Sequence, residues 1–348
     1  MSAKLFSTVS GTGKTREVIE ATAPIRICDN GGWTDTWFGG PGRILNIAVR
    51  PGVEVSIRTT VEAGPVMLDV ETFGDRYSVV PRVSRVARHP LLEAAIDTLP
   101  PPADVAVEVS VRSGIPAGCG TGTSAAVAVA LLGALGALRS EHRSRREIAY
   151  AAHGLEVDIL GVESGIQDQF SAAFGGINYL EIETYPEARL TRLPAWEGIS
   201  PLLTFTLVFL GRPHDSSAVH RQVIDDVAGR GSEAFAPLRD AAVAARDAVM
   251  ARDLRAFGQA MIANTEAQGC LHPALVGVDA RRVIDVAASL GAIGWKVNGA
   301  GGNGGSVTVL SGSEKTKGIL EHRLAELDAR YRVLPVQIST GLEVRGGP

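Results

Sequence analysis

The amino-acid sequence predicts an α+β protein that is built from two domains. A chain of 348 residues is long for a single hydrophobic core and is typical of about two domains. Segments with the alternating pattern of strands come first, apolar segments with helical periodicity follow, and the second half of the chain repeats this order. Strands and helices that are grouped in this way favour an α+β arrangement over a regular alternation of strand and helix.

The strands of the first half are predicted from alternating apolar and polar residues. This pattern is typical of antiparallel strands with one buried face. An apolar "IRI" segment around Arg26 predicts a further, buried strand. The alternating strands are expected at residues 52–61, 66–72 and 104–111.

Two helices and one strand are expected next. Residues 125–138 form an apolar run of 14 residues, which is too short to span a bilayer and suits a buried helix. Thr123 or Ser124 would be its N-cap. Ser144 and Glu147 form a capping box for the second helix, and residues 175–183 return as a strand. The apolar face of the second helix is expected to contain Ile148, Ala152, Leu155 and Ile159.

A stretch rich in turn formers, residues 184–201, is the expected domain boundary. It separates an N-terminal domain (1–190) from a C-terminal domain (200–348). The C-terminal domain should contain, in order, a buried strand, a helical region broken near "GCLHP", a strand, a helix and a last strand. These elements are expected at residues 202–210, 233–292, 305–310, 313–331 and 332–339.

The composition is that of an ordinary soluble globular protein, with 45% hydrophobic and 21% charged residues. A net charge of -4 gives no electrostatic reason to expect nucleic acid or an anionic membrane as partner. The three cysteines are widely spaced and predict neither a disulfide framework nor a zinc site. No charged-then-apolar signal segment opens the chain. We therefore expect a cytoplasmic protein without a nucleic-acid or membrane partner, and its expected oligomeric state is a monomer or homodimer.

One stretch near the N-terminus, "GTGKT" at residues 11–15, resembles a phosphate-binding P-loop. The P-loop pattern requires another glycine where Thr8 stands, and a buried strand before it. The preceding "MSAKLFS" is too short and too polar for that strand. The stretch is therefore interpreted as a polar lead-in, in which Lys14 has no role in nucleotide binding.

A second glycine-rich stretch, "SGIPAGCGTGTSAA" from residue 113, is a better anion site. Gly118, Gly120 and Gly122 alternate between a predicted strand and the apolar helix. Alternate glycines allow consecutive backbone N–H groups to point at one anion, and the helix N-terminus adds free N–H groups and a positive dipole end. Thr123 and Ser124 add hydroxyls for a phosphate or its Mg²⁺. The simpler alternative is a tight strand-to-helix turn.

Two further loops have the composition of binding sites. In "KVNGAGGNGG", five glycines lie between residues 298 and 305, which favours close backbone approach over a flexible connection. In "APIRICDNGGWTD", a double-glycine turn precedes polar residues, which suit hydroxyl binding or an ordinary hairpin turn. There Thr34 and Asp35 would bind hydroxyls, and Trp33 would offer a flat apolar face to a sugar ring.

Two carboxylates complete the set. Glu156 lies on the second predicted helix, and Asp168 follows twelve residues later within "QDQF". They can converge on one metal–phosphate site, although each taken alone is better explained by a surface charge or a helix cap.

In this order the motifs resemble those of the GHMP kinase superfamily of small-molecule kinases. "PAGCGTGTSAA" (116–126) is similar to the family's phosphate-loop motif, with Thr121 and Thr123 replacing a leucine and a serine. "KVNGAGGNGG" is similar to the C-terminal motif with one extra residue. "APIRICDNGGWTD" and "GIQDQFSAAFGG" resemble the substrate and catalytic segments of sugar-1-kinases of the D-glycero-D-manno-heptose 7-phosphate kinase and fucokinase type. "CDN" at 28–30 and Trp33 depart from those enzymes.

The resemblance implies a fold and a set of roles. The fold would be a ribosomal protein S5 domain 2-like N-terminal domain and a ferredoxin-like C-terminal domain. Asp168 would be the catalytic base with Arg26 beside it, and Ser124 and Glu156 would hold Mg²⁺. The substrate would contact Gly32, Trp33, Thr34, Asp35 and Gly165. ATP would contact Pro116, Gly118, Cys119, Gly120, Thr121, Gly122, Thr123, Ser124, Gly301 and Gly302.

The implied activity is transfer of the ATP γ-phosphate to a hydroxyl of a sugar or sugar phosphate. The expected acceptor resembles D-glycero-D-manno-heptose 7-phosphate, modified at the anomeric hydroxyl. A C7-cyclitol or its phosphate, or a catalytically silent sugar-binding regulator, are the alternatives; an ATP-dependent decarboxylase is disfavoured by "GGWTD" and "QDQF". An acceptor that already carries a phosphate would need basic side chains in the site. The candidates are Arg43, Arg50, Arg212 and His214.

Overall fold

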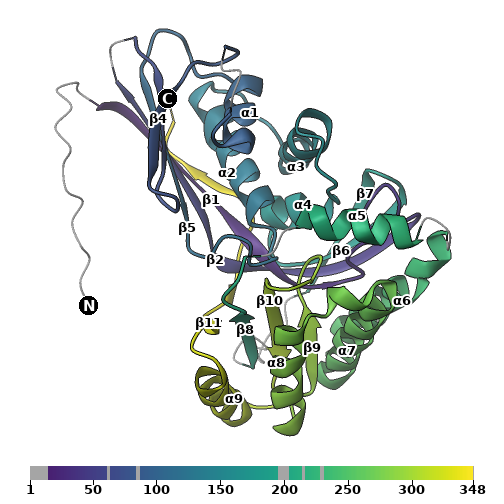
Figure 1. The fold of residues 1–348 in the computed structure, drawn as a ribbon. Coiled ribbons are helices and arrows are strands. Elements are labelled where there is room, and N and C mark those ends of the chain that lie inside the picture. The colour runs from purple at the N-terminus through teal and green to yellow at the C-terminus, as the bar shows by residue number, and fades with distance from the viewer. Residues whose placement is uncertain are drawn as a thin grey trace.

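The computed structural model describes residues 15–60, 63–83, 87–194, 204–213, 216–227 and 231–347. Within them the chain forms a nine-stranded and a four-stranded sheet with helices packed against both. Helices α1 to α4 lie together on one side of the large sheet, and α6, α7 and the small sheet lie on the other (Figure 1). Among the described residues, no helix combines the length and the apolarity needed to cross a membrane.

The large sheet takes strands from both ends of the chain, with a main order of β13-β1-β2-β5-β3-β4. β2 is long enough to pair with β6 through its first residues and with β5 through its last. β6 and β7 form a hairpin on one edge, and the two-residue β12 also pairs with β2. The strands are β1 (Thr15–Asn30), β2 (Gly42–Thr60), β3 (Val66–Val70), β4 (Asp75–Val79), β5 (Val107–Ser113), β6 (Ile177–Thr184), β7 (Glu187–Leu193), β12 (Gln337–Ile338) and β13 (Glu343–Arg345).

The helices that cover this sheet have the burial that their sequences predict. α2 is apolar around its whole circumference and is almost completely buried. The capping box before α3 is confirmed, since Ser144 Oγ accepts from the Glu147 amide and Glu147 Oε2 accepts from the Ser144 amide. The elements are α1 (Pro90–Thr98), α2 (Thr123–Leu138), α3 (Arg145–Gly154), a π-helical turn η1 (Leu155–Ile159) and α4 (Gln167–Phe174).

The small sheet has the order β11-β8-β10-β9 and is antiparallel throughout. In chain order this is the 4-1-3-2 arrangement of a ferredoxin-like domain, so the predicted fold class is confirmed. The strands are β8 (Phe205–Phe209), β9 (Gly294–Val297), β10 (Ser306–Leu310) and β11 (Arg332–Leu334). The helices and helical turns are α5 (Ser216–Val227), η3 (Ser232–Phe235), α6 (Ala236–Ala251), α7 (Leu254–Leu271), η4 (Pro273–Leu275), α8 (Val278–Ser289) and α9 (Glu314–Leu327).

Several predicted strands differ from the structure. β3 and β5 pair in parallel, because the chain crosses over through β4 and α1 between them, so the expectation of antiparallel strands was wrong for this pair. β7 lies inside the stretch 184–201 that was expected to be turns. The last expected strand, 332–339, is split at Pro335, which has no N–H for a ladder. Its first part joins the small sheet and its second part joins the large one.

Two helical predictions also need correction. α2 is capped by Gly122 in a left-handed conformation, so Thr123 and Ser124 lie in the first turn and are not the N-cap. Ile159 was expected on the buried face of α3, but it is 56% exposed, because the π-helical turn adds a residue and rotates it off that face. The expected helix 313–331 ends at Leu327, where Arg330 donates to Asp328 in a turn.

One continuous hydrophobic core joins the two sheets. It extends from α2 and the large sheet to Phe205 on β8 and Phe257 on α7. The two rings pack edge to face with centroids 6.3 Å apart. The cavities described below therefore lie between parts of the chain that share one packed interior.

Phe257→Ala should lower the free energy of unfolding by about 3–5 kcal/mol, because it leaves a cavity where both sheets are packed. Urea unfolding followed by circular dichroism would measure this. Ile319→Ala, at a side chain that is 44% exposed on α9, is the matched control and should change stability by less than about 1 kcal/mol. Equal losses in the two variants would contradict a shared core at Phe257.

Candidate functional site

A polar cavity of about 310 Å³ opens where the end of β1, the start of α2 and the loop after β9 converge. Most of its wall comes from the residues that the sequence motifs singled out. Its lining residues are Arg26, Asp29, Trp33, Asp35, Thr36, 118–124, Glu156, 162–165, Gln167, Asp168, Gly299 and Ala300.

The glycine-rich segment 118–122, which we call the phosphate-type loop, has the backbone conformation that its glycines predict. Gly118, Gly120 and Gly122 have φ values of 70°, 73° and 71°, which residues with a side chain rarely adopt. These alternating left-handed residues lead directly to the N-terminus of α2. Because Gly122 is the cap, the hydroxyls of Thr123 and Ser124 are free to lie on the cavity wall. The arrangement is a concave set of N–H groups and hydroxyls suited to an anion.

Arg26 and Asp168 form a bidentate pair. Arg26 Nε donates to Asp168 Oδ1 at 2.8 Å, and Nη2 donates to Oδ2 at 3.2 Å. The guanidinium is buried and also donates from Nη1 to the Gly120 carbonyl. The carboxylate is 23% exposed and lies in the first turn of α4. Arg26 thus fixes the orientation of Asp168 while the carboxylate remains accessible from the cavity.

Gly122 also allows Asp168 to approach the start of α2. A Cβ atom at Gly122 would lie 2.9 Å from Asp168 Cγ, so any side chain there would push the carboxylate away. The pairing of Arg26 with Asp168 was expected from the family resemblance. The absence of a side chain at Gly122 is what allows this pair to lie so close to the phosphate-type loop.

Glu156 lies on the π-helical turn η1, where one extra residue per turn aims it at the cavity. Ser164 Oγ donates to its Oε2 at 2.9 Å and Gln169 Nε2 donates to the same atom at 2.6 Å. The Ser124 hydroxyl is a further hydrogen-bond partner, and burial raises the pKa of Glu156.

This donor set fits Mg²⁺. The described residues contain no cluster of three or more His, Cys, Asp or Glu side chains that could hold a metal alone. Mg²⁺ usually takes one or two protein oxygens, with substrate phosphates and water completing its shell. The Glu156 carboxylate and Ser124 hydroxyl, beside a loop suited to phosphates, meet that requirement.

Asp35 is a buried residue of the cavity wall and is held by Gln167. The Gln167 amide donates to Asp35 Oδ2 at 3.0 Å, and its side chain donates to Oδ1 at 3.3 Å. Burial raises the pKa of Asp35 from 3.8 to about 6. A Cβ atom at Gly165 would lie 2.0 Å from Asp35 Oδ2, so Gly165 provides the space that this carboxylate occupies.

A second, mainly apolar cavity of about 310 Å³ adjoins the phosphate-type loop. It shares Gly118, Thr123 and Ser124 with the polar cavity. Phe73, which is 61% exposed, and His89 belong to its wall, and their rings lie 5.4 Å apart. The sequence analysis did not anticipate this cavity, because its walls come from β3, α1 and β5.

Five expected site residues do not line the polar cavity. Thr34 donates to the Gly31 carbonyl instead, and Gly32 packs against Asp29. The Gly302 amide donates to the Leu275 carbonyl, which places that part of the loop against η4. Lys14 and His214 lie outside the described residues. The five are Gly32, Thr34, Pro116, Gly301 and Gly302.

The basic residues considered for a substrate phosphate have other surroundings. Arg43 pairs with Glu183 at 2.6 Å, and Arg50 donates to Gln337. Arg212 is exposed on the loop after β8. None of these three lines the polar cavity.

Sequence reasoning missed Asp29, Glu163, Ser164 and Gln167. Asp29 lies at a register irregularity between Ile27 and Asn30 in the ladder that β1 forms with β2. Such bulges re-aim side chains and often lie beside active sites. The polar "CDN" at the end of an apolar strand was the available signal.

Known proteins with similar sequences include small-molecule kinases. Residues 83–176 match the family model of the N-terminal domain of GHMP kinases. A mevalonate kinase from Pyrococcus horikoshii is 29% identical over 219 residues, which cover 61% of this chain and 62% of that protein. A D-glycero-alpha-D-manno-heptose 7-phosphate kinase from Campylobacter jejuni is 24% identical over 197 residues, covering 55% and 58%. The chain thus spans about three fifths of the length of these curated relatives.

Solved structures agree over nearly the whole chain. A D-glycero-D-manno-heptose 1-phosphate kinase from Bacteriodes thetaiotaomicron superposes with a TM-score of 0.74 at 21% identity, covering 94% of this chain and 98% of that one. The fold and cavity define an α+β protein with two sheets and a glycine-rich loop at the seam between them. More particularly, residues 83–176 match the N-terminal domain of GHMP kinases, and the chain has the fold of the solved heptose 1-phosphate kinase and of a solved mevalonate kinase.

Asp35→Asn should flatten the pH dependence of stability. Because burial raises the pKa of Asp35 above its unfolded value, the folded protein binds this proton more tightly. The free energy of unfolding of the wild type should therefore fall as the pH rises from about 4 to about 6. The contribution of Asp35 is at most about 3 kcal/mol. Urea unfolding at a series of pH values measures the slope.

Asp285→Asn, at an exposed carboxylate on α8, is the control and should keep the wild-type slope. A wild-type slope in Asp35→Asn would contradict the raised pKa.

Proposed function

We propose that this protein is an ATP-dependent kinase that transfers the γ-phosphate to a hydroxyl of a sugar-type acceptor. The observation that carries the proposal is the Asp168 carboxylate, held by Arg26 beside a glycine loop and a helix N-terminus. Phosphoryl transfer depends mainly on positioning and on stabilising charge on phosphate oxygens, and this site has groups for both. The named kinase relatives support the same class.

The reaction forms a bond between the acceptor oxygen and the γ-phosphorus and breaks the bond to ADP. Asp168 accepts or orients the proton of the attacking hydroxyl. Arg26 fixes the orientation of this carboxylate by contacting both of its oxygens. Asp35, in the cavity wall, orients other hydroxyls of the acceptor, and Trp33 offers an apolar surface.

The phosphate end of the site belongs to the loop and to α2. Backbone N–H groups of residues 118–122 and the N-terminus of α2 stabilise the phosphate oxygens. Ser124 and Glu156 would hold Mg²⁺, which supplies charge neutralisation at the phosphates when it is bound. Ser164 and Gln169 orient the Glu156 carboxylate.

The apolar cavity beside the loop fits the base of the nucleotide. It shares walls with the phosphate site, and its exposed Phe73 offers a face on which a heteroaromatic ring stacks. A base in this cavity would place its phosphates on the loop.

The charge of the acceptor wall favours a hydroxyl-rich substrate. The described lining residues include five carboxylates and a single cation, Arg26, which is committed to Asp168. Carboxylates accept hydrogen bonds from hydroxyls and repel an acid such as mevalonate. The carboxylates therefore favour the hydroxyls of a sugar as the acceptor. The motif resemblance favours a heptose 7-phosphate-like sugar modified at its anomeric hydroxyl, and its 7-phosphate would have to lie away from these carboxylates, because Arg26 is the one cation among the described lining residues.

A C7-cyclitol or its phosphate is the second candidate. The "CDN" departure at residues 28–30 falls on the site itself, because Asp29 lines the cavity. A changed acceptor wall supports a changed acceptor, and a cyclitol has the same hydroxyl-rich chemistry.

The test is ADP release by the wild type across sugars, the same sugars as phosphates, cyclitols and mevalonate. We expect turnover with at least one hydroxyl-rich acceptor. Asp168→Asn should reduce kcat about 10²–10⁴-fold, because it removes the proton acceptor, and should leave the affinity for ATP unchanged, because the glycine loop and Ser124 are retained.

Asp285→Asn is the control for this series. Tight sugar binding without any turnover would favour the regulator instead, and wild-type kcat in Asp168→Asn would remove Asp168 as base.

Phe73→Ala should raise the KM for ATP about 5- to 10-fold with little change in kcat, since a lost stacking contact is worth about 1–1.5 kcal/mol. Steady-state kinetics at saturating acceptor measure this. Val83→Ala removes another exposed apolar side chain, which does not line this cavity, and should leave KM unchanged. An unaltered KM in Phe73→Ala would place the base elsewhere.

A further inference from the structure

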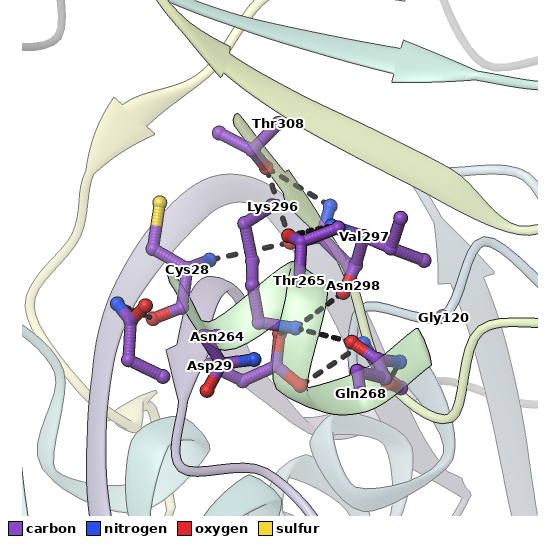
Figure 2. Close-up of polar contacts among 12 residues, drawn as sticks. Cys28, Asp29, Gly120, Asn264, Thr265, Gln268, Lys296, Val297, Asn298 and Thr308 are labelled. Carbon is purple, nitrogen blue, oxygen red and sulfur yellow. Dashed lines mark hydrogen bonds and ion pairs between the residues drawn. The ribbon is translucent and has the colours of Figure 1, made fainter. Parts of the chain in front are cut away.

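Beneath the polar cavity lies a fully buried lysine to which none of the motifs gave a role. Lys296, on β9, is 1% exposed. Its ammonium pairs with Asp29 Oδ1 at 3.4 Å, donates to Gln268 Oε1 at 3.1 Å, and donates to the Val297 carbonyl (Figure 2). Removing an ammonium from water is costly unless its partners compensate the charge. Burial lowers the pKa of Lys296, and the charge of Asp29 opposes that effect.

Asp29 faces Lys296 from the end of β1. It is 1% exposed, and its Oδ2 accepts from the Gly299 amide at 3.0 Å. The same oxygen lies 3.9 Å from Arg26 Nη2. Oδ1 makes no hydrogen bond in the described part of the chain, so the Lys296 ammonium is its charge partner.

Gln268, on α7, completes a closed ring of contacts. Its Oε1 accepts from Lys296, and its Nε2 donates to the Gly299 carbonyl at 3.0 Å. Asp29 therefore accepts from the N–H of Gly299 and Gln268 donates to its C=O, and Lys296 contacts both of these side chains. We call Lys296, Asp29, Gly299 and Gln268 the four-residue ring; Figure 2 labels three of its members, Lys296, Asp29 and Gln268.

The four-residue ring lies where the two glycine loops touch. Gly299 has φ +64°, and a Cβ atom there would lie 2.8 Å from the Gly120 carbonyl oxygen. That same carbonyl accepts from Arg26, which orients Asp168. A second link runs nearby, since the Cys28 amide donates to Asn298 Oδ1 at 3.3 Å.

We propose that Lys296 is a positioning residue. Through Asp29 and Gln268 it holds Gly299 against Gly120. It also begins a row of alternating positive and negative charges, which runs through Lys296, Asp29, Arg26 and Asp168. The distance between the loops and the orientation of Arg26 are thereby set together. Without Lys296, the buried Asp29 carboxylate would compete with Asp168 for Arg26.

The first arm of the test is hydrogen–deuterium exchange, which needs no turnover and does not depend on the proposed function. Lys296→Met should speed exchange in peptides covering residues 298–302 and 118–122, because Asp29 and Gln268, which restrain Gly299, both lose the ammonium that positions them. Lys315→Met, at an exposed lysine on α9, is the matched control and should leave both peptides unchanged. Unchanged exchange at 298–302 in Lys296→Met would overturn the proposal.

The second arm is kinetic and rests on the proposed function. Lys296→Met should lower both the Tm and kcat. Adding Asp29→Asn removes the unpaired charge and should restore the Tm, while kcat stays about 10–100-fold below wild type and the KM for ATP changes less than about threefold. Recovery of kcat together with the Tm would overturn the positioning role and leave Lys296 as a stabiliser of the fold only.

Gln268→Met tests the same ring without leaving a buried charge unpaired, and it replaces the double variant if that protein does not fold. We expect faster exchange at 298–302 and a kcat loss of the same order. Wild-type exchange and kcat in this variant would overturn the proposal. If the wild type turns over no acceptor but Lys296→Met still shows the expected faster exchange, the kinase assignment is refuted and the positioning role of Lys296 stands.

Discussion

The Arg26 guanidinium is the group on which the architecture of the site depends. It is buried, so its charge requires compensation from within the protein. Asp168 supplies two hydrogen bonds, Gly120 supplies a carbonyl, and Asp29 approaches from the side. The backbone N–H of Arg26 also donates to the Thr121 carbonyl at 2.9 Å. Three segments, namely α4, the phosphate-type loop and the end of β1, are therefore held around one cation.

The second constraint is the close contact of the two glycine loops. Gly120 and Gly299 approach until no side chain fits between them, and Lys296 neutralises the carboxylate that holds Gly299 in place. The two sheets share one hydrophobic core, so packing fixes their relative position. The polar groups of the site lie where the two sheets meet. The polar cavity brings the backbone N–H groups of the glycine loop and the N-terminus of α2 together with the carboxylates of Asp168, Glu156 and Asp35. The proposed phosphoryl transfer to a hydroxyl would use both kinds of group.

The sequence predicted the parts of the site that are local in the chain. The glycines at 118, 120 and 122 carry their own backbone requirement, so the loop was recognisable without a structure. Asp168 and Glu156 were found through the order of motifs. Asp29 and Gln167 were missed, because a buried polar residue has no periodic pattern and its partners lie more than a hundred positions away. The π-helical turn was missed for a similar reason: it changes the direction of Glu156 and Ile159 without changing the apolar pattern before it.

By itself, the sequence determined the α+β class, the main strands and helices, the capping box at Ser144 and the glycine loop, because each depends on periodicity or on a backbone preference of nearby residues. Only the tertiary structure decided that β3 pairs in parallel with β5, that the last strands divide between two sheets, and that Gly122 caps α2. It alone brought Lys296 to Asp29. These features depend on contacts between segments that are distant in the sequence. The free energy of pairing a buried charge or an unpaired strand outweighs the conformational preferences of the local sequence.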